Sequence, residues 1–168
     1  MTSIDLLRDA AEFTKKALKD VVLKKNTFAE KGYDEETGIS VYKGYIPEKE
    51  GETKAVPYVL LQATNGADDD EKDKNECNIR FVFVLYFATR EEGALGVLGV
   101  MERLRIALRK EGVLNKQYGI GKIEWLTYPY GEEPYYIGEM TVAFGMPSVK
   151  RTEEGIWEIL NAGEFKKE

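Results

Sequence analysis

The sequence predicts an α+β fold: a mixed or antiparallel sheet of roughly four to five strands, packed by an N-terminal helix and a central helix. Three observations predict it. Residues 77–89 are apolar at most positions, which is typical of a central strand covered on both faces. From Val97 to Leu108, apolar residues then recur at three- and four-residue steps, as on a helix that lies on a sheet. Residues 119–128 and 135–144 alternate like further strands.

The chain is long enough for one domain with its own core. Its 168 residues divide into a single α/β domain, residues 1–147, and a C-terminal arm, residues 148–168. The arm contains a candidate short helix, Glu153 to Leu160, with Ile156, Trp157 and Leu160 on one face. Such an arm docks either on its own domain or on a neighbouring molecule.

The first predicted element is an amphipathic helix from Thr2 to Lys25. Thr2 and Asp5 have the spacing of a capping box, in which each side chain accepts a hydrogen bond from the other residue's backbone N–H. The predicted apolar stripe consists of Ile4, Leu7, Ala11, Leu18 and Val21.

Two strands are predicted before the central one. The first lies within residues 38–47 and is weakened by Gly44. The second is Ala55 to Thr64, where Pro57 is confined to the beginning of the strand or to an edge. A polar loop, Asn65 to Glu76, connects it to the central strand, so we expect an antiparallel hairpin.

The hairpin loop is strongly acidic. Its carboxylates suggest a divalent-cation site, but their spacing differs from the alternating ligands of an EF-hand, and no glycine marks the bend. A mobile hairpin tip whose charges repel one another is the favoured interpretation, and no metal is predicted. The weak metal candidates are Asp68, Asp69, Asp70 and Asp73, and the loop set adds Glu71.

The central helix has clear terminal signals. Glu91 and Glu92 place negative charge at its N-terminus, and Gly112 is positioned to end it. Gly93, Gly96 and Gly99 do not have the spacing of a dinucleotide fingerprint. We expect these glycines to allow close backbone approach along one side of the helix.

Four tyrosines cluster around the predicted turn between the last two strands, residues 129–134. Aromatic residues here could stack on nucleic-acid bases, but no arginine or lysine is interleaved with them, so a protein interface is favoured. The predicted interface residues are Tyr128, Tyr130, Tyr135 and Tyr136, with Trp157 of the arm.

Composition argues against several functions. The chain has no histidine, the commonest general base and metal ligand, and its one cysteine, Cys77, has no histidine partner. A net charge of −6 argues against general affinity for duplex nucleic acid. No signal peptide and no run of about 18 apolar residues is present, so we expect no membrane span. We predict no enzyme activity, no catalytic residue and no cofactor.

Four short segments resemble the tail-terminator (tail-completion) proteins of long-tailed bacteriophages and prophages. The likeness extends over roughly residues 3–148 and also rests on the order of the elements. The segments are Val41 to Pro47, Val56 to Leu60, Ile79 to Phe83 and Gly138 to Val142.

The resemblance implies a virion structural protein. Family members are small α/β sandwiches that assemble into a ring, typically a homo-hexamer, which caps the tail tube and offers a head-joining surface. The implied partners are other copies of the chain, the tail tube protein and a head-completion or connector protein, with DNA only as the passing genome. The implied location is the host cytoplasm during assembly and then the tail of the virion.

Two alternatives stay open. One is another head–tail connector or tail-assembly factor with the same small α/β plan. The other is a small metal-dependent enzyme that uses the carboxylates of the acidic loop.

Overall fold

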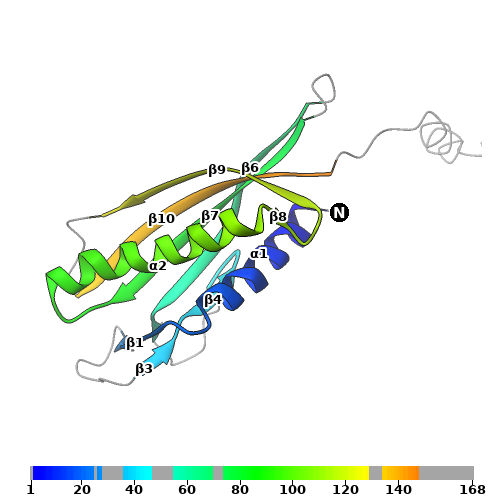
Figure 1. Cartoon of the computed structure of the whole chain (residues 1–168). Coiled ribbons are helices and arrows are strands. Elements are labelled where there is room, and N and C mark those ends of the chain that lie inside the picture. The colour runs from blue at the N-terminus through cyan, green and yellow to red at the C-terminus, as the bar shows by residue number, and fades with distance from the viewer. Residues whose placement is uncertain are drawn as a thin grey trace, which may run out of the picture.

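The computed structural model describes residues 2–24, 26–27, 36–46, 55–69, 74–128 and 134–147. In this part of the chain each of two helices is followed by a run of strands (Figure 1). In order, the elements are α1 (Ser3–Leu18), β1 (Val22–Lys24), β2 (Asn26–Thr27), β3 (Glu36–Gly38), β4 (Ser40–Lys43), β5 (Ala55–Val56), β6 (Tyr58–Asp69), β7 (Lys74–Tyr86), α2 (Arg90–Glu111), β8 (Val113–Leu114), β9 (Tyr118–Thr127) and β10 (Tyr135–Gly145).

The main sheet has six strands in the order β4-β6-β7-β10-β9-β8. β4 runs parallel to β6, and the other neighbours are antiparallel, so the sheet is mixed. The remaining described strands form two small pairs, β1 with β3 and β2 with β5. The predicted α+β class is therefore confirmed, with one strand more in the main sheet than the sequence indicated.

Both helices lie on the same face of the main sheet (Figure 1). The core forms there, because side chains alternate between the two faces along each strand. On β7, Ile79, Phe81, Phe83 and Leu85 are fully buried against the helices. β7 is an inner strand, as predicted. The expected cover on both faces is only partly found among the described residues: on the face without helices Val84 is buried, but Arg80, Val82 and Tyr86 are half-buried.

α1 begins as predicted and ends earlier. The Thr2 hydroxyl accepts a hydrogen bond from the Asp5 N–H, and the Asp5 carboxylate accepts one from the Thr2 N–H, which is a complete capping box. The predicted stripe is only partly correct: Ala11 and Leu18 are buried, and Leu7 and Val21 pack partly buried against the core. Ile4 is 60% exposed, and the prediction omitted Leu6, which is fully buried. The residues that face the core are Leu6, Ala10, Ala11, Thr14 and Leu18.

α2 matches its prediction closely. Thr89 caps the N-terminus, and Gly112 at φ 68° ends the helix by donating its N–H to the Leu108 carbonyl at 3.0 Å. Positive φ is costly for other residues, so glycine suits this position. The predicted stripe Val97, Val100, Met101, Leu104 and Leu108 is buried.

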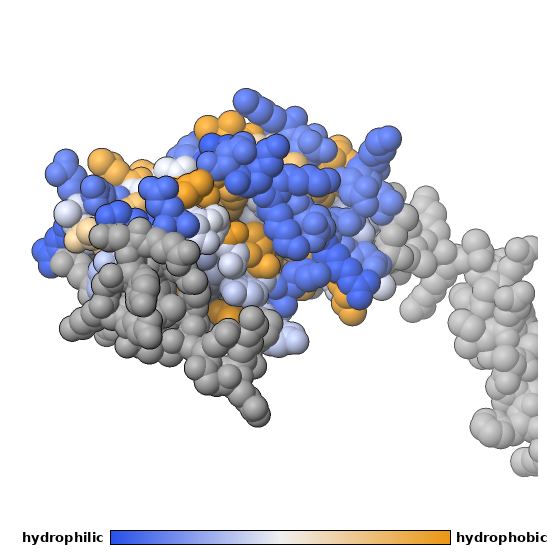
Figure 2. Space-filling model, turned by 90° about the horizontal axis from the view of Figure 1, so that it is seen from below, coloured by the Kyte–Doolittle hydropathy of each residue, from blue (hydrophilic) through white to orange (hydrophobic). Residues whose placement is uncertain are grey.

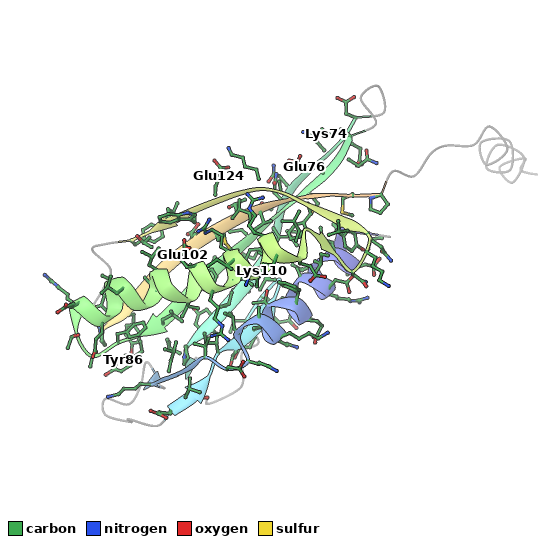
Figure 3. All side chains as sticks on the ribbon, viewed as in Figure 1. Lys74, Glu76, Tyr86, Glu102, Lys110 and Glu124 are labelled. Atoms are coloured by element: carbon green, nitrogen blue, oxygen red, sulfur yellow. The ribbon has the colours of Figure 1, made fainter. Side chains whose placement is uncertain are left out.

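The hairpin differs most from its prediction. β6 continues to Asp69 and β7 begins at Lys74, so most of the predicted loop is paired strand. Asn65 and Gly66 do not open a loop; they follow a β-bulge, where the register shifts between Ala63 and Asn65. The paired ribbon projects beyond the rest of the sheet (Figure 1). Lys74 and Glu76 mark this projecting end of β7, and Tyr86 its opposite end (Figure 3).

Several predicted features lie outside the described residues. They are the loop residues Asp70, Glu71 and Asp73, the interface candidate Tyr130, and the arm 148–168 with Trp157. Neither described helix is long and apolar enough to cross a bilayer.

Candidate interaction surface

One face of the main sheet carries neither α1 nor α2, and we call it the open face. Cross-strand pairing defines its rows, because directly paired residues point to the same side. One row runs from Leu60 through Val82 and Glu139 to Leu126. The adjacent row is polar and contains Gln62, Arg80, Thr141 and Glu124. The open face therefore has an apolar half and a polar half.

The apolar half of the open face is rich in tyrosine. The rings of Tyr42 and Tyr58 meet edge to face with their centroids 5.9 Å apart. Tyr86 and Tyr135 are tilted at 6.2 Å. Rigid aromatic side chains that keep a polar tip are enriched at protein interfaces. The apolar half consists of Tyr42, Tyr58, Leu60, Val82, Val84, Tyr86, Leu126, Tyr135 and Ile137.

A charged cluster marks the boundary between the two halves. Arg80 donates two hydrogen bonds to the Glu139 carboxylate, from Nε at 2.8 Å and from Nη2 at 2.5 Å. Tyr128, directly after β9, donates its hydroxyl to the same carboxylate at 2.9 Å. The cluster thus ties β7 and β10 to the chain that leaves β9.

The same contacts set the ionisation of the cluster. The hydrogen bonds from Arg80 hold the pKa of Glu139 below its ordinary value, and burial opposes this only in part. The hydrogen bond to Glu139 raises the pKa of Tyr128. Glu139 therefore stays ionised and Tyr128 keeps its proton at neutral pH. A satisfied, ionised carboxylate is unsuited to general acid catalysis, so we interpret the cluster as structural.

The polar half holds a shallow hollow of about 410 Å³. Its charges pair with each other: Lys122 lies 2.7 Å from Glu124, and Lys74 lies 3.3 Å from Glu76. Such exposed pairs contribute little to stability. A larger hollow of about 800 Å³ lies between the start of α1 and the projecting hairpin. The carboxylates of Asp68 and Glu76 line it, so it is unsuited to an anionic ligand.

The structure separates the predicted tyrosines. Tyr128 is 44% exposed, and Tyr135 is half-buried on the open face. Tyr136 is 7% exposed, packs on Phe87 on the helix side and donates its hydroxyl to the Thr89 carbonyl. Tyr136 therefore belongs to the core, and its assignment to an interface is wrong.

Sequence reasoning missed Arg80 and Glu139. Each is a charge inside an otherwise apolar strand, and that interruption was a usable signal. Their partnership depends on the register of β7 against β10, which places Arg80 opposite Thr141, next to Glu139 on the same face.

The acidic candidates do not gather into a described site. Asp68 and Asp69 end β6, and the other predicted cation ligands lie outside the described residues. Among the residues that the structure describes, no group of three or more acidic or cysteine side chains has the geometry of a metal site. Cys77 is buried, and burial raises the pKa of its thiol, which opposes reactivity.

The surface is also divided between polar and apolar areas elsewhere. Seen from below, apolar residues are exposed in separate places between hydrophilic ones (Figure 2).

No protein-family model matches the chain, and no curated protein matches it significantly.

Proposed function

We propose that this protein is a phage or prophage structural subunit that caps a tail tube as a homo-oligomeric ring and provides the head-joining surface. The resemblance of four short segments to tail-terminator proteins supplies the specific identity. The open face carries the structural side of the proposal. A sheet with helices on one face and an apolar, tyrosine-rich half on the other is suited to burial against partners.

The projecting hairpin fits a position near the DNA channel. Asp68 and Asp69 lie at the described end of β6, in the part of the β6–β7 ribbon that projects beyond the rest of the sheet (Figure 1). Carboxylates that face a channel repel DNA phosphates, so the genome slides past instead of binding. The same reasoning limits DNA to a passing cargo. In this proposal the protein acts in the host cytoplasm during assembly and then remains in the virion tail.

Deletion of the gene from its phage or prophage tests the function. We expect tail tubes of uncontrolled length that do not join heads, visible by negative-stain electron microscopy. A plasmid copy of the wild-type gene should restore infectious particles. Tails of normal length that lack only the head would favour the alternative of a head–tail joining protein. Wild-type particles from the deletion would contradict both.

A further inference from the structure

The two outer strands of the main sheet leave complementary edges open. β4 is the last strand on one side, and beyond β9 on the other side only the short β8 is paired, opposite Tyr118 and Gly119. No described strand pairs with the outer edge of β4 or with the remainder of β9. Native proteins usually cover or disrupt long open edges, because such edges recruit other strands.

The backbone groups at the β9 edge point away from the molecule. Tyr128 donates its N–H to the Ile137 carbonyl at 3.1 Å, and hydrogen-bonded pairs alternate along an antiparallel ladder. The neighbouring pairs Thr127–Gly138 and Trp125–Met140 are therefore not hydrogen-bonded. It follows that the N–H and C=O groups of Trp125 and Thr127 face outward.

The outer edge of β4 has the matching arrangement. The N–H groups of Ser40 and Gly44 bond to the Pro57 and Leu61 carbonyls, so the even-numbered residues of β4 face β6. Val41 and Lys43 consequently direct their backbone groups outward. The Lys43 carbonyl already accepts a hydrogen bond from the Tyr45 N–H. The groups that remain for a partner strand are the Lys43 N–H and both the N–H and the C=O of Val41.

The two edges also match in their position along the strands and in their strand direction. Pairing across the sheet places Val41 level with Thr127, and Lys43 level with Trp125. β4 runs parallel to β6, and three antiparallel steps separate β6 from β9, so β4 and β9 run in opposite directions. Hence a neighbouring copy, displaced sideways at the same height, presents β4 antiparallel to β9 with outward-facing backbone groups opposite each other.

The side chains at this junction suit each other. On the open face, Leu126 would lie opposite Tyr42 of the next copy, which extends the apolar row. On the helix face, the ring of Trp125 would lie opposite the ammonium group of Lys43, a favourable pairing of cation and aromatic ring. Trp125 is 49% exposed and Leu126 is 46% exposed in the single chain, so both have apolar area left to bury.

We propose that the β9 edge of one copy pairs antiparallel with the β4 edge of the next, so that the sheets join head to tail. This contact deepens the proposed ring function and rests on it for the number of copies. The contact is heterologous: it uses two different surfaces, and it closes into a ring when the rotation between copies allows. Pairing of β9 with β9 or of β4 with β4 would instead give closed two-fold dimers.

Engineered disulfides test the contact on the full-length protein. Leu126 and Tyr42 would form a non-hydrogen-bonded cross-strand pair, with Cα atoms about 4.5 Å apart, which suits a disulfide. Within one chain the same residues are four strand steps apart, or about 19 Å at 4.8 Å a step, which a disulfide cannot span. Cys77 is buried and can stay in place.

The double variant Leu126→Cys/Tyr42→Cys should give a ladder of covalent oligomers on non-reducing gels after mild oxidation at the highest soluble concentration. Each single variant should stay monomeric on the gel. A mixture of the two single variants should stop at the dimer. The matched control Trp125→Cys/Tyr42→Cys, with thiols on opposite faces of the sheet, should give little ladder.

Three results would overturn the edge pairing. They are no ladder from the double variant, an equal ladder from the opposite-face control, or dimers from Leu126→Cys alone, which would indicate two-fold pairing of β9. The proposed function is judged separately by the deletion phenotype. If the double variant gives a ladder but the deletion gives wild-type particles, the edge contact stands and the proposed function is rejected. If the deletion gives overlong tails but the double variant gives no ladder, the function stands and the edge contact is rejected.

Discussion

At the scale of single residues, the Arg80–Glu139 pair shows how a charge is accommodated within an apolar sheet. Glu139 accepts hydrogen bonds from both Arg80 and Tyr128, and its side chain is only 16% exposed. A carboxylate buried to this extent without partners would be costly. The side chain of Arg80 is 40% exposed, so water screens part of the attraction.

Replacement of Glu139 tests this account. We expect Glu139→Gln to lower the free energy of unfolding by about 1 kcal/mol at neutral pH, below the usual range for hydrogen bonds to charged groups because of that screening. The hydrogen bonds from Arg80 hold the folded-state pKa of Glu139 below the ordinary value of a glutamate. Its stabilisation is therefore present above the unfolded-state pKa and is lost as pH falls through the folded-state pKa.

The measurement is urea unfolding of both proteins from pH 7 down into the range below the ordinary glutamate pKa. The difference between wild type and variant should shrink as the pH falls. Glu124→Gln is the control, because Glu124 is 64% exposed in its pair with Lys122, and it should change stability by less than about 0.5 kcal/mol. A difference that grows toward acid would contradict the pKa direction.

At the scale of secondary-structure elements, the glycines of α2 determine how closely the helix approaches the sheet. A Cβ added at Gly93 would lie 2.1 Å from the Tyr136 ring, and one at Gly96 would lie 2.2 Å from the Phe87 ring. A Cβ at Gly99 meets nothing within 4 Å. The expected close approach is thus confirmed at two of the three glycines, and the third faces open space.

This difference gives a matched pair of substitutions. Gly93→Ala should destabilise the protein by about 1–3 kcal/mol, since the Tyr136 ring must move although its hydroxyl is held by Thr89. Gly99→Ala should stabilise it by about 0.5–1 kcal/mol, because alanine is the better helix former. Chemical denaturation measures the free energy of unfolding of both variants. Equal effects of the two substitutions would mean that α2 does not pack on Tyr136.

The elements that sequence analysis predicted well have a strong periodic signal of their own. The buried stripe of α2 and the inward face of β10 follow directly from apolar spacing. The distal part of β6 has no such signal, because Asn65, Gly66 and Asp68 are typical turn residues. They are extended because β7 pairs with them residue by residue. Similarly, the register that joins Arg80 to Glu139 is a property of two strands together, which neither strand reveals alone.

At the scale of the whole molecule, the two faces of the main sheet differ, because both helices lie on one face and neither lies on the other. The helices bury the centre of one face of the sheet, while the open face and the outer edges of β4 and β9 retain apolar side chains and backbone groups. The proposed ring function needs such surfaces, and it also needs self-association to stay weak until the assembly site is available. Short outer strands such as β4 reconcile the two demands, since a brief edge gives a weak contact.

A proline substitution at the β9 edge tests assembly with little expected effect on folding. The N–H of Thr127 faces away from β10, so Thr127→Pro removes no hydrogen bond to the described strands, and proline is tolerated on edge strands. We expect its free energy of unfolding to stay within about 1 kcal/mol of the wild-type value. The Thr127 N–H that would bond Val41 of the next copy is lost, so sedimentation velocity should show weaker self-association.

Two further variants define what this result means. Thr127→Val keeps the N–H and should associate like the wild type. Leu126→Pro removes an N–H that faces β10, so it should destabilise the monomer clearly more than Thr127→Pro does. If Thr127→Pro instead unfolds the chain as readily as Leu126→Pro, both N–H groups are bonded within the molecule. The β9 edge would then be closed, and the proposed ring would require another contact surface.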